Sequence, residues 1–156
     1  MIGGGSGGLA AASAASKYGA KVALADFVKP SPGGTSWGLG GTCVNVGCIP
    51  KKLFHYAALL GESRGDLRSA GWDINEHAKH NWQKLSDRIT AYIRSLNLTY
   101  KKTLATDKVT YFNALASLSS KHILELTSKD GSKQVLSAKY ILIATGGRPS
   151  RPGIPG

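Results

Sequence analysis

Two short apolar patterns, separated by Gly19, lie near the start of the chain. Residues 9–18 are rich in alanine and predict a helix, with Gly19 as its stop signal. Residues 21–27 are mostly apolar, lie between Gly19 and Pro30, and predict a buried strand. Residues 29–41 hold two prolines and five glycines and predict a loop. A helix followed by a buried strand is typical of α/β proteins.

The middle of the chain shows two helical patterns. Residues 50–60 predict a helix with Pro50 in its first turn, where the missing N–H costs little. Apolar side chains then return at helical spacing over a longer stretch and predict a second, amphipathic helix. Its apolar positions are Trp82, Leu85, Ile89, Ile93, Leu96 and Tyr100.

Shorter apolar segments follow, and they predict strands rather than helices. Asp130-Gly131 is a hairpin turn signal between two of them. Residues 140–145, YILIAT, predict a buried strand that ends at Gly146-Gly147. Three short antiparallel strands are predicted before it, at residues 109–118, 122–127 and 134–137.

The composition is that of a globular chain. Of the 156 residues, 42% are apolar and 19% are charged, which suits one domain with a core rather than a disordered chain. The longest apolar runs, such as residues 140–144, are too short to cross a membrane. No basic and then apolar leader opens the sequence, so we expect no signal peptide. Two cysteines do not make a secreted disulfide scaffold.

The formal charge of +11 raises the question of a polyanionic partner such as a nucleic acid. The lysines and arginines are scattered, without a dense run or regular aromatic interleaving. We therefore expect a solvated basic surface and no nucleic-acid partner. A phosphate-bearing cofactor would also suit a chain of this charge.

Gly3, Gly5 and Gly8 have the spacing G-x-G-x-x-G of a phosphate-binding loop. In such a loop the first glycine makes a tight turn, the second lets the backbone approach a pyrophosphate, and the third lets helix and strand pack closely. The context agrees, because Asp26 lies eighteen residues past Gly8, where an acid accepts hydrogen bonds from a ribose. The alternative is a flexible glycine linker with Asp26 as a strand-end charge. The loop alone leaves FAD and NAD open as ligands.

Cys43 and Cys48 are the two cysteines of the chain, and a metal site is one explanation for them. Zinc needs about four protein ligands. The histidines are not spaced to complete such a site, and two of them lie in a polar stretch typical of a surface. They are His55, His77, His80 and His122. We therefore expect no metal site.

A disulfide between Cys43 and Cys48 depends on the backbone between them. Residues five apart in an ideal helix have Cα atoms about 8–9 Å apart. A disulfide needs Cα atoms within about 7 Å. Gly47 and Pro50 predict an irregular turn and then a helix that begins near Cys48, and a helix N-terminus with two lysines nearby favours a thiolate there. We favour a reactive thiol pair over a small structural staple or two inert thiols.

Residues 40–52, GGTCVNVGCIPKK, resemble the redox-active segment of the flavoprotein disulfide reductases. These include glutathione reductase, dihydrolipoamide dehydrogenase, mercuric reductase and the large thioredoxin reductases. Residues 26–62, with a proline-containing insertion and Trp-Gly before the cysteines, are similar to the large thioredoxin reductases and to thioredoxin-glutathione reductase. The similarity continues through SLNLTY and ILIATGGRP to GIPG, so it covers nearly the whole chain. Leu98 and Gly147 depart from the usual thioredoxin reductase residues, and many glutathione reductases share the glycine.

The resemblance implies an α/β fold: a Rossmann-type FAD-binding domain with a parallel sheet and a small antiparallel β-meander, its first strand largely missing. The domain would span residues 1–146 and would be incomplete at its N-terminus. Residues 147–156 would be a linker toward an NADPH-binding domain that is absent from this chain.

The resemblance also implies roles for individual residues. Cys48 would lie against the isoalloxazine ring as the charge-transfer thiolate, Cys43 would be the interchange thiol, and Lys51 would assist hydride transfer near the flavin N5. The pyrophosphate and ribose contacts would be Gly3, Gly5, Ser6, Gly7, Gly8 and Asp26, with Phe27 beside them. The flavin contacts would be Gly41, Thr42 and Gly47, together with Cys48 and Lys51. Ala116 would meet the adenine, and Thr145 and Gly146 would belong to a turn that contacts FAD.

The implied enzyme is an NADPH-dependent thioredoxin-disulfide reductase. Electrons would pass from NADPH to FAD, then to the Cys43–Cys48 disulfide, then to thioredoxin or a similar protein disulfide. We expect a homodimer in the cytoplasm, with a mitochondrial location left open. A glutathione or thioredoxin-glutathione reductase is the alternative. A third hypothesis is a flavin-binding fragment without turnover; we favour it for the 156-residue chain itself, which we expect not to reduce thioredoxin with NADPH.

Overall fold

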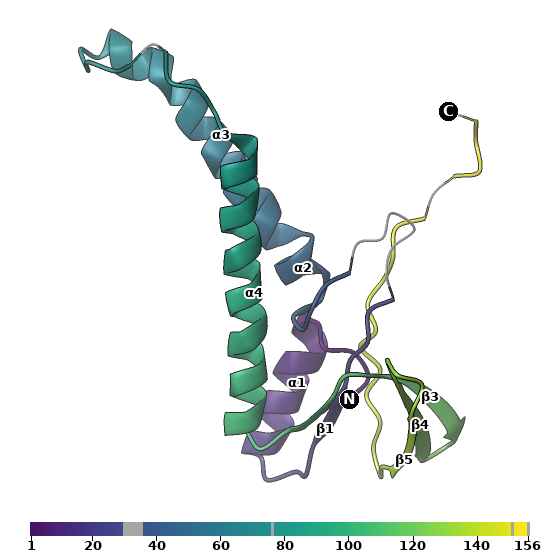
Figure 1. Cartoon of the computed structure of the whole chain (residues 1–156). Helices are drawn as coiled ribbons and strands as arrows, with labels where there is room; N and C mark the ends of the chain where they lie inside the picture. The colour runs from purple at the N-terminus through teal and green to yellow at the C-terminus, as the bar shows by residue number, and fades with distance from the viewer. Residues whose placement is uncertain (30–35, 76, 151, 156) are drawn as a thin grey trace.

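The computed structural model describes residues 1–29, 36–75, 77–150 and 152–155, arranged as helices beside two small sheets (Figure 1). The helices are α1 (Ser6–Lys17), α2 (Gly41–Asn45), α3 (Cys48–Ser69) and α4 (Trp82–Thr106). The strands are β1 (Ala23–Ala25), β2 (Thr110–Phe112), β3 (Ala114–Ser120), β4 (Ile123–Ser128) and β5 (Lys133–Ser137). No helix in these described ranges is long and apolar enough to cross a membrane.

A narrow parallel sheet lies at the centre of the fold. β1 pairs with β2 in parallel, and on its other side Ala25 bridges Ile2 in parallel. Ile2 in turn bridges Ile143, and the Ala144 N–H donates to the Ile2 carbonyl at 2.8 Å. α1 therefore crosses between two neighbouring parallel segments, which is the connection expected in an α/β fold.

The prediction of a buried strand at residues 140–145 is wrong. Only the bridge at Ile143 forms in this segment, and Tyr140 and Ile143 are 81% and 63% exposed. A continuous apolar run is typical of a strand that is covered on both faces. Here the described helices leave its outer side open, and the pairing with Ile2 is too short to make a strand.

The prediction of one antiparallel strand at residues 109–118 is also wrong. β2 ends at Phe112 and β3 begins at Ala114, and the two strands belong to different sheets. β2 pairs in parallel with β1, which lies far away in the sequence. A local sequence pattern cannot predict pairing with so distant a strand. The apolar residues of the segment predicted only that it forms a strand.

The antiparallel meander of β3, β4 and β5 is confirmed. Asp130 and Gly131 form the turn between β4 and β5, as predicted. Gly131 has a φ of +85°, and the Asp130 Oδ1 accepts a hydrogen bond from the Ser132 N–H at 3.0 Å. Lys133 and Glu125 then pair across the two strands at 2.9 Å.

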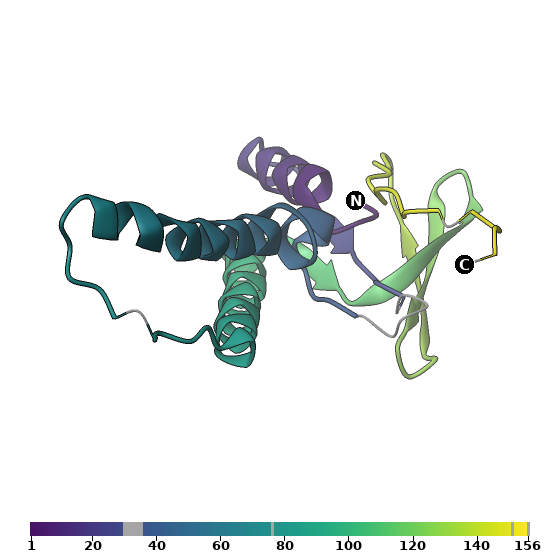
Figure 2. The ribbon, with the colours of Figure 1, turned by 90° about the horizontal axis from the view of Figure 1, so that it is seen from above.

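α3 and α4 run in opposite directions and project away from the sheets as a helical arm (Figure 2). The rings of Phe54 and Trp82 stack between them, with 4.9 Å between their centroids. Arg64 on α3 holds the connecting segment by donating to the carbonyls of Asn75 and Ala78. Both helices are longer than the sequence pattern predicted.

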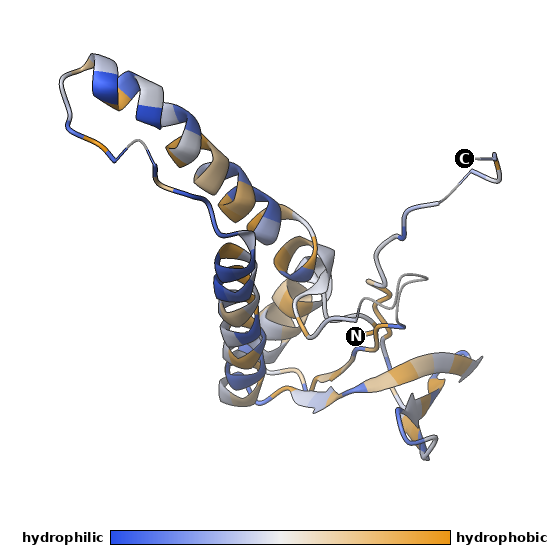
Figure 3. Cartoon of the chain, turned by 45° about the horizontal axis from the view of Figure 1, so that its top comes forward, coloured by the Kyte–Doolittle hydropathy of each residue, from blue (hydrophilic) through white to orange (hydrophobic). Residues whose placement is uncertain are grey.

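The helical arm keeps large apolar side chains at its surface. Apolar and polar residues alternate in bands along both helices (Figure 3). The side chains of Tyr56, Leu60 and Trp82 are exposed, and Trp72 in the connecting segment is exposed as well. The arm is therefore less well covered than the body of the fold.

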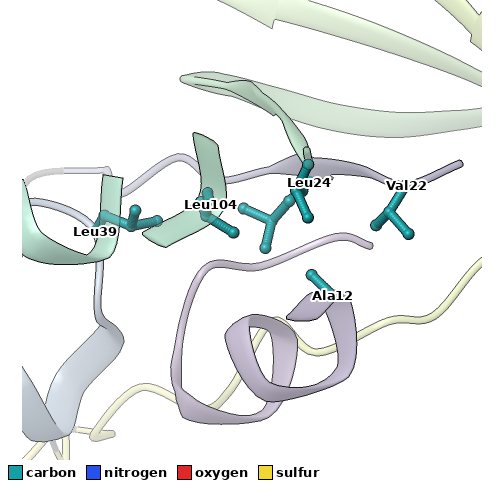
Figure 4. Close-up of a cluster of buried hydrophobic side chains, with 6 residues drawn as sticks. Ala12, Val22, Leu24, Leu39 and Leu104 are labelled. Atoms are coloured by element: carbon teal, nitrogen blue, oxygen red, sulfur yellow. The ribbon is translucent and has the colours of Figure 1, made fainter. Parts of the chain in front are cut away.

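The larger hydrophobic cluster joins α1, β1 and α4 (Figure 4). Leu39 belongs to it although it comes from the loop before α2, and it is only 5% exposed. The buried members are Ala12, Val22, Leu24, Leu39, Leu104 and Val109. A second cluster connects the two sheets through Ala25, Ala114 and Leu126. The core thus anchors the loop that leads to the first cysteine.

Candidate functional site

The glycine loop at residues 3–8 makes the tight turn that its spacing predicts. Gly3 has a φ of +106°, and a Cβ on it would lie 2.2 Å from the Ala144 carbonyl oxygen. A Cβ on Gly8 would lie 1.8 Å from the Gly3 carbonyl oxygen. Since no side chain fits at either place, these two glycines let α1 and the segment at Ala144 approach the loop closely.

The N-terminus of α1 has the character of an anion site. Gly5 is its N-cap residue in an extended conformation, and no side chain in the described part of the chain caps the helix. Ser6 and Gly7 in the first turn are exposed. The N–H groups of a first turn lack partners within the helix and attract negative charge. This arrangement fits the pyrophosphate contact expected from the sequence.

Asp26 lies directly after β1, next to the glycine loop. Its Oδ1 accepts a hydrogen bond from the Gly4 N–H at 2.8 Å, and the residue is half-buried. Burial raises the pKa of this carboxyl, while backbone hydrogen bonds from Gly4 and Phe27 pull the pKa back down. Asp26 therefore joins the loop through one oxygen, at the place expected for a ribose contact.

The pKa of Tyr111 on β2 is affected by the same carboxyl. Burial, and then the negative charge of Asp26, raise the pKa of Tyr111 to about 12. The tyrosine therefore stays neutral at physiological pH, and its ring packs against the larger hydrophobic cluster.

The helix is broken between the two cysteines, as the sequence predicts. α2 ends at Asn45, Gly47 has φ −126° and ψ −115°, and Cys48 is the first residue of α3. Both cysteines are free thiols; Cys43 is half-buried and Cys48 is exposed. Cys48 is thus at a helix N-terminus, where the helix dipole favours negative charge.

The two thiols interact with each other. A hydrogen bond between the side chains of Cys43 and Cys48 is the largest cause that raises the pKa of Cys43. The positive charge of Lys51 acts in the opposite direction and lowers the pKa of Cys43. With its pKa raised, Cys43 is a protonated thiol at neutral pH, close enough to Cys48 and Lys51 for both to act on it.

The redox segment and the glycine loop meet. The Gly40 N–H donates to the Gly4 carbonyl at 2.9 Å. Gly41 has a φ of +72°, and a Cβ on it would lie 2.6 Å from the Cα of Gly5. Two motifs that lie apart in the sequence are therefore in direct contact, and the contact lies at the start of the helix that contains Cys43.

Lys51 borders a groove between the two helices of the arm. The groove has a volume of about 410 Å³ and is lined by residues that include Asn45, Pro50, Phe54 and Ile89. Lys51 itself is exposed on the first turn of α3. Its ammonium group is thus free to approach a molecule bound beside Cys48.

The remaining predicted contacts lie around the same loop. Thr145 and Gly146 follow Ala144 and are exposed, and the Thr145 nitrogen is 3.1 Å from the place of a Cβ on Gly3. Ala116 lies on β3 and packs against the cluster that contains Ala25, the last residue of β1. Thr42 is exposed on α2.

Two asparagines at this site were missed by the sequence reasoning. The Nδ2 of Asn45 donates to the carbonyls of Gly38 (3.1 Å) and Gly41 (2.8 Å). The Nδ2 of Asn97 donates to the Leu39 carbonyl (2.6 Å) and to the Asn45 Oδ1 (2.9 Å). The sequence did contain a signal for Asn97. It lies four residues after Ile93, so it is a polar residue on the apolar face of its helix.

Comparison with known proteins agrees with this site. The sequence model described as "Pyridine nucleotide-disulphide oxidoreductase" matches residues 1–156. The chain belongs to the pyridine nucleotide-disulphide oxidoreductase family. The resemblance of the cysteine segment to this family's flavoproteins is therefore confirmed, as is the α/β fold with a parallel sheet and an antiparallel meander.

One member of the family shows how much of such a protein is present. Thioredoxin reductase SEP1 of Emiliania huxleyi is 53% identical over 156 residues, which are 100% of this chain and 31% of that relative. The chain thus spans 31% of the relative's length. Family membership supports the role of a redox flavoprotein, an oxidoreductase.

Proposed function

We propose that the chain is the FAD-binding, redox-disulfide part of an NADPH-dependent thioredoxin-disulfide reductase. The observation behind the proposal is the close approach of Gly5 and Gly41, because it unites a phosphate-binding loop and a thiol pair in one site. The 53% identity to a relative named thioredoxin reductase supports thioredoxin, or a similar protein disulfide, as the substrate.

The residues present fit FAD. The uncapped first turn of α1 suits a pyrophosphate. Asp26, which accepts the Gly4 N–H on Oδ1, lies beside the loop where a carboxylate can bind ribose hydroxyls. When bound, FAD would supply the step that accepts a hydride from NADPH and passes the electron pair to the Cys43–Cys48 disulfide. The further proposed contacts are Gly3, Ser6, Gly7, Gly8, Phe27, Gly41, Thr42, Gly47, Ala116, Thr145 and Gly146.

The reduced thiol pair then reduces the substrate disulfide. The Cys43 sulfur, once deprotonated, attacks one substrate sulfur; a mixed disulfide forms, and the other substrate sulfur leaves as a thiolate and takes up a proton. The Cys48 thiolate attacks the Cys43 sulfur and closes the Cys43–Cys48 disulfide, and the second substrate sulfur leaves as a thiolate that takes up a proton. The substrate gains two electrons and two protons; the protein pair supplies both electrons and the Cys43 proton, and solvent supplies the second proton.

Cys43 needs a base for this attack. Its raised pKa keeps it protonated at neutral pH, beside the sulfur of Cys48. This need supports the second candidate, a flavin-binding unit without turnover of its own, as the behaviour of the 156-residue chain alone.

The proposal extends to partners and to domain organisation. The exposed apolar side chains of the helical arm, Leu60 and Trp72 among them, are consistent with a homodimer contact of the full-length protein. Residues 1–146 would form the FAD-binding domain, and residues 147–156 would lead toward an NADPH-binding domain. A cytoplasmic location would suit such an enzyme.

The test is an absorption spectrum of the purified chain mixed with FAD, before and after a dithiol is added. Bound flavin that gains a long-wavelength band shows a thiolate against the ring. We expect Cys48→Ser to lose this band and Cys43→Ser to keep it. A folded chain that binds no FAD would refute the cofactor, and the opposite pattern in the two variants would refute the assignment of the cysteines. Addition of NADPH and thioredoxin should give no turnover.

A further inference from the structure

The two asparagines tie the redox segment to a helix distant in sequence. Asn97 on α4 reaches the loop before α2 with both N–H groups of its side chain, to the Leu39 carbonyl and to the Asn45 Oδ1. Asn45 is 7% exposed, and its Nδ2 donates hydrogen bonds to the Gly38 and Gly41 carbonyls. Three carbonyls of one short loop are thus held through a single side chain of α4.

The same loop is held from its other side. The Gly40 N–H bonds to the Gly4 carbonyl, and the Leu39 side chain is buried in the larger hydrophobic cluster. A Cβ on Gly4 would lie 2.4 Å from the Leu39 Cδ1, so the loop and the glycine motif are in direct contact. The asparagines complete a clamp around residues 38–41.

The clamp matters because α2, which contains Cys43, cannot hold its own position. α2 has five residues, Gly41–Asn45, and no side chain in the described structure caps its start. A single isolated turn of helix is unstable in water. The place of Cys43 relative to Cys48 therefore depends on the bonds at the two ends of α2, which are those of Gly41 and Asn45.

We infer that Asn97 is a positioning residue for the Cys43–Cys48 pair and acts through Asn45 and the loop at residues 38–41. This inference rests on the proposed function, in which the pair cycles between dithiol and disulfide. A disulfide demands a narrow range of sulfur and Cα geometry, so holding the two thiols close favours its formation. Loss of the clamp should make the disulfide easier to reduce.

The experiment measures the redox equilibrium of the 156-residue chain. The chain is equilibrated in buffers with a series of ratios of reduced to oxidised glutathione, then quenched with acid and alkylated. Mass spectrometry separates the two forms, because the disulfide form lacks the two alkyl groups that the dithiol form gains. Asn97→Ala removes two hydrogen bonds, and we expect the equilibrium constant for disulfide formation to fall about tenfold, or by about 30 mV in potential. Thr99→Ala is the matched control, because Thr99 is exposed on the same helix and bonds only within it, to Ser95.

A second variant disturbs the clamp without touching α4. Gly38→Ala adds a Cβ that would lie 2.9 Å from the Cγ and the Oδ1 of Asn97, so the side-chain amide must move. We expect a shift in the same direction as with Asn97→Ala. Circular dichroism confirms that each variant is folded, and Gly38→Ala provides the test if Asn97→Ala does not fold.

The outcomes separate the inference from the proposed function. A shift in the Asn97 and Gly38 variants, with Thr99→Ala unchanged, supports the inference. The inference is overturned if the wild-type chain forms the disulfide and the folded variants have equilibrium constants within about twofold of the wild-type value. In that case the proposed redox pair still stands. Equal shifts in all three variants also overturn the inference. A wild-type chain that forms no disulfide at any glutathione ratio overturns both.

Discussion

Gly41 approaches Gly5 so closely that a Cβ on Gly41 would lie 2.6 Å from the Gly5 Cα. Gly5 caps the helix whose N-terminus fits a pyrophosphate, and Gly41 begins the helix that contains Cys43. This contact determines how far the thiol pair lies from the phosphate loop. A cofactor that spans both must match that spacing.

Gly41→Ala should therefore damage cofactor binding and stability together. Gly41 has a φ of +72°. An alanine there would be strained by about 1–2 kcal/mol from its backbone alone, before the clash with Gly5. We expect FAD affinity, measured by quenching of flavin fluorescence, to fall at least about tenfold, because the two motifs are forced apart.

Gly19→Ala is the matched control for this change. Gly19 has a φ of +85°, and no atom lies within 4 Å of the place of its Cβ. Gly19→Ala should lose only the stability that corresponds to backbone strain, measured by urea unfolding, and should keep its FAD affinity. If Gly41→Ala binds FAD as tightly as Gly19→Ala does, the close approach plays no part in cofactor binding.

Asp26 should make stability depend on pH. Burial raises the pKa of Asp26, so the folded chain binds this proton more tightly than the unfolded chain. The corresponding stabilisation is present below the ordinary aspartate pKa of about 3.9 and is lost as pH rises through the raised value. Asp26→Asn, which keeps an acceptor for the Gly4 N–H, should therefore lose less stability than wild type between pH 4 and pH 7.

Melting temperatures of wild type and Asp26→Asn, taken at intervals across that range, would show the effect. The exposed Asp73 provides the control, and Asp73→Asn should follow wild type. Parallel curves for all three proteins would mean that burial of Asp26 has no net effect on folding. FAD affinity should fall in Asp26→Asn at pH 7, because the charged acceptor for a ribose is gone.

The chemistry of the site was predictable because its motifs are local. The spacing of Gly3, Gly5 and Gly8 requires a turn that only glycine can make, and the structure has that turn. The break at Gly47 between the cysteines likewise follows from residues within a few positions of each other. Each of these predictions depends on the chain's own local geometry.

Contacts between distant segments were not predictable in the same way. Asn97 reaches Asn45 across 52 residues, and nothing near either residue reports the other. The apolar run at residues 140–145 predicted burial, yet burial depends on what covers the segment, and Ile143 is exposed. Residues 109–118 were predicted as one strand, but β2 pairs with the distant β1 and belongs to a different sheet from β3.

Leu104 should be the costliest position of α4 to truncate. It is 2% exposed and lies in the cluster that also buries Leu39, from the loop before the redox pair. Leu104→Ala should reduce the free energy of unfolding by about 2–5 kcal/mol. Leu98→Ala, on the same helix but 62% exposed, should change it by at most about 0.5 kcal/mol. Urea unfolding followed by circular dichroism measures both, and similar losses for the two would contradict the core described here.

The alkylation rate of Cys43 should respond in opposite directions to changes at its two neighbours. The hydrogen bond with Cys48 raises the pKa of Cys43, and the charge of Lys51 lowers it. Because the thiolate is the nucleophile, a raised pKa means slow alkylation at neutral pH and a rise in rate as pH increases. Cys48→Ala removes the larger cause, so Cys43 should react several-fold faster at pH 8. Lys51→Ala removes the opposing charge, so Cys43 should react more slowly.

The rate of alkylation of Cys43 by iodoacetamide, followed by peptide mass from pH 6 to pH 10, tests both directions. A Cys48→Ala chain that alkylates at the wild-type rate throughout would show that Cys48 does not raise the pKa of Cys43.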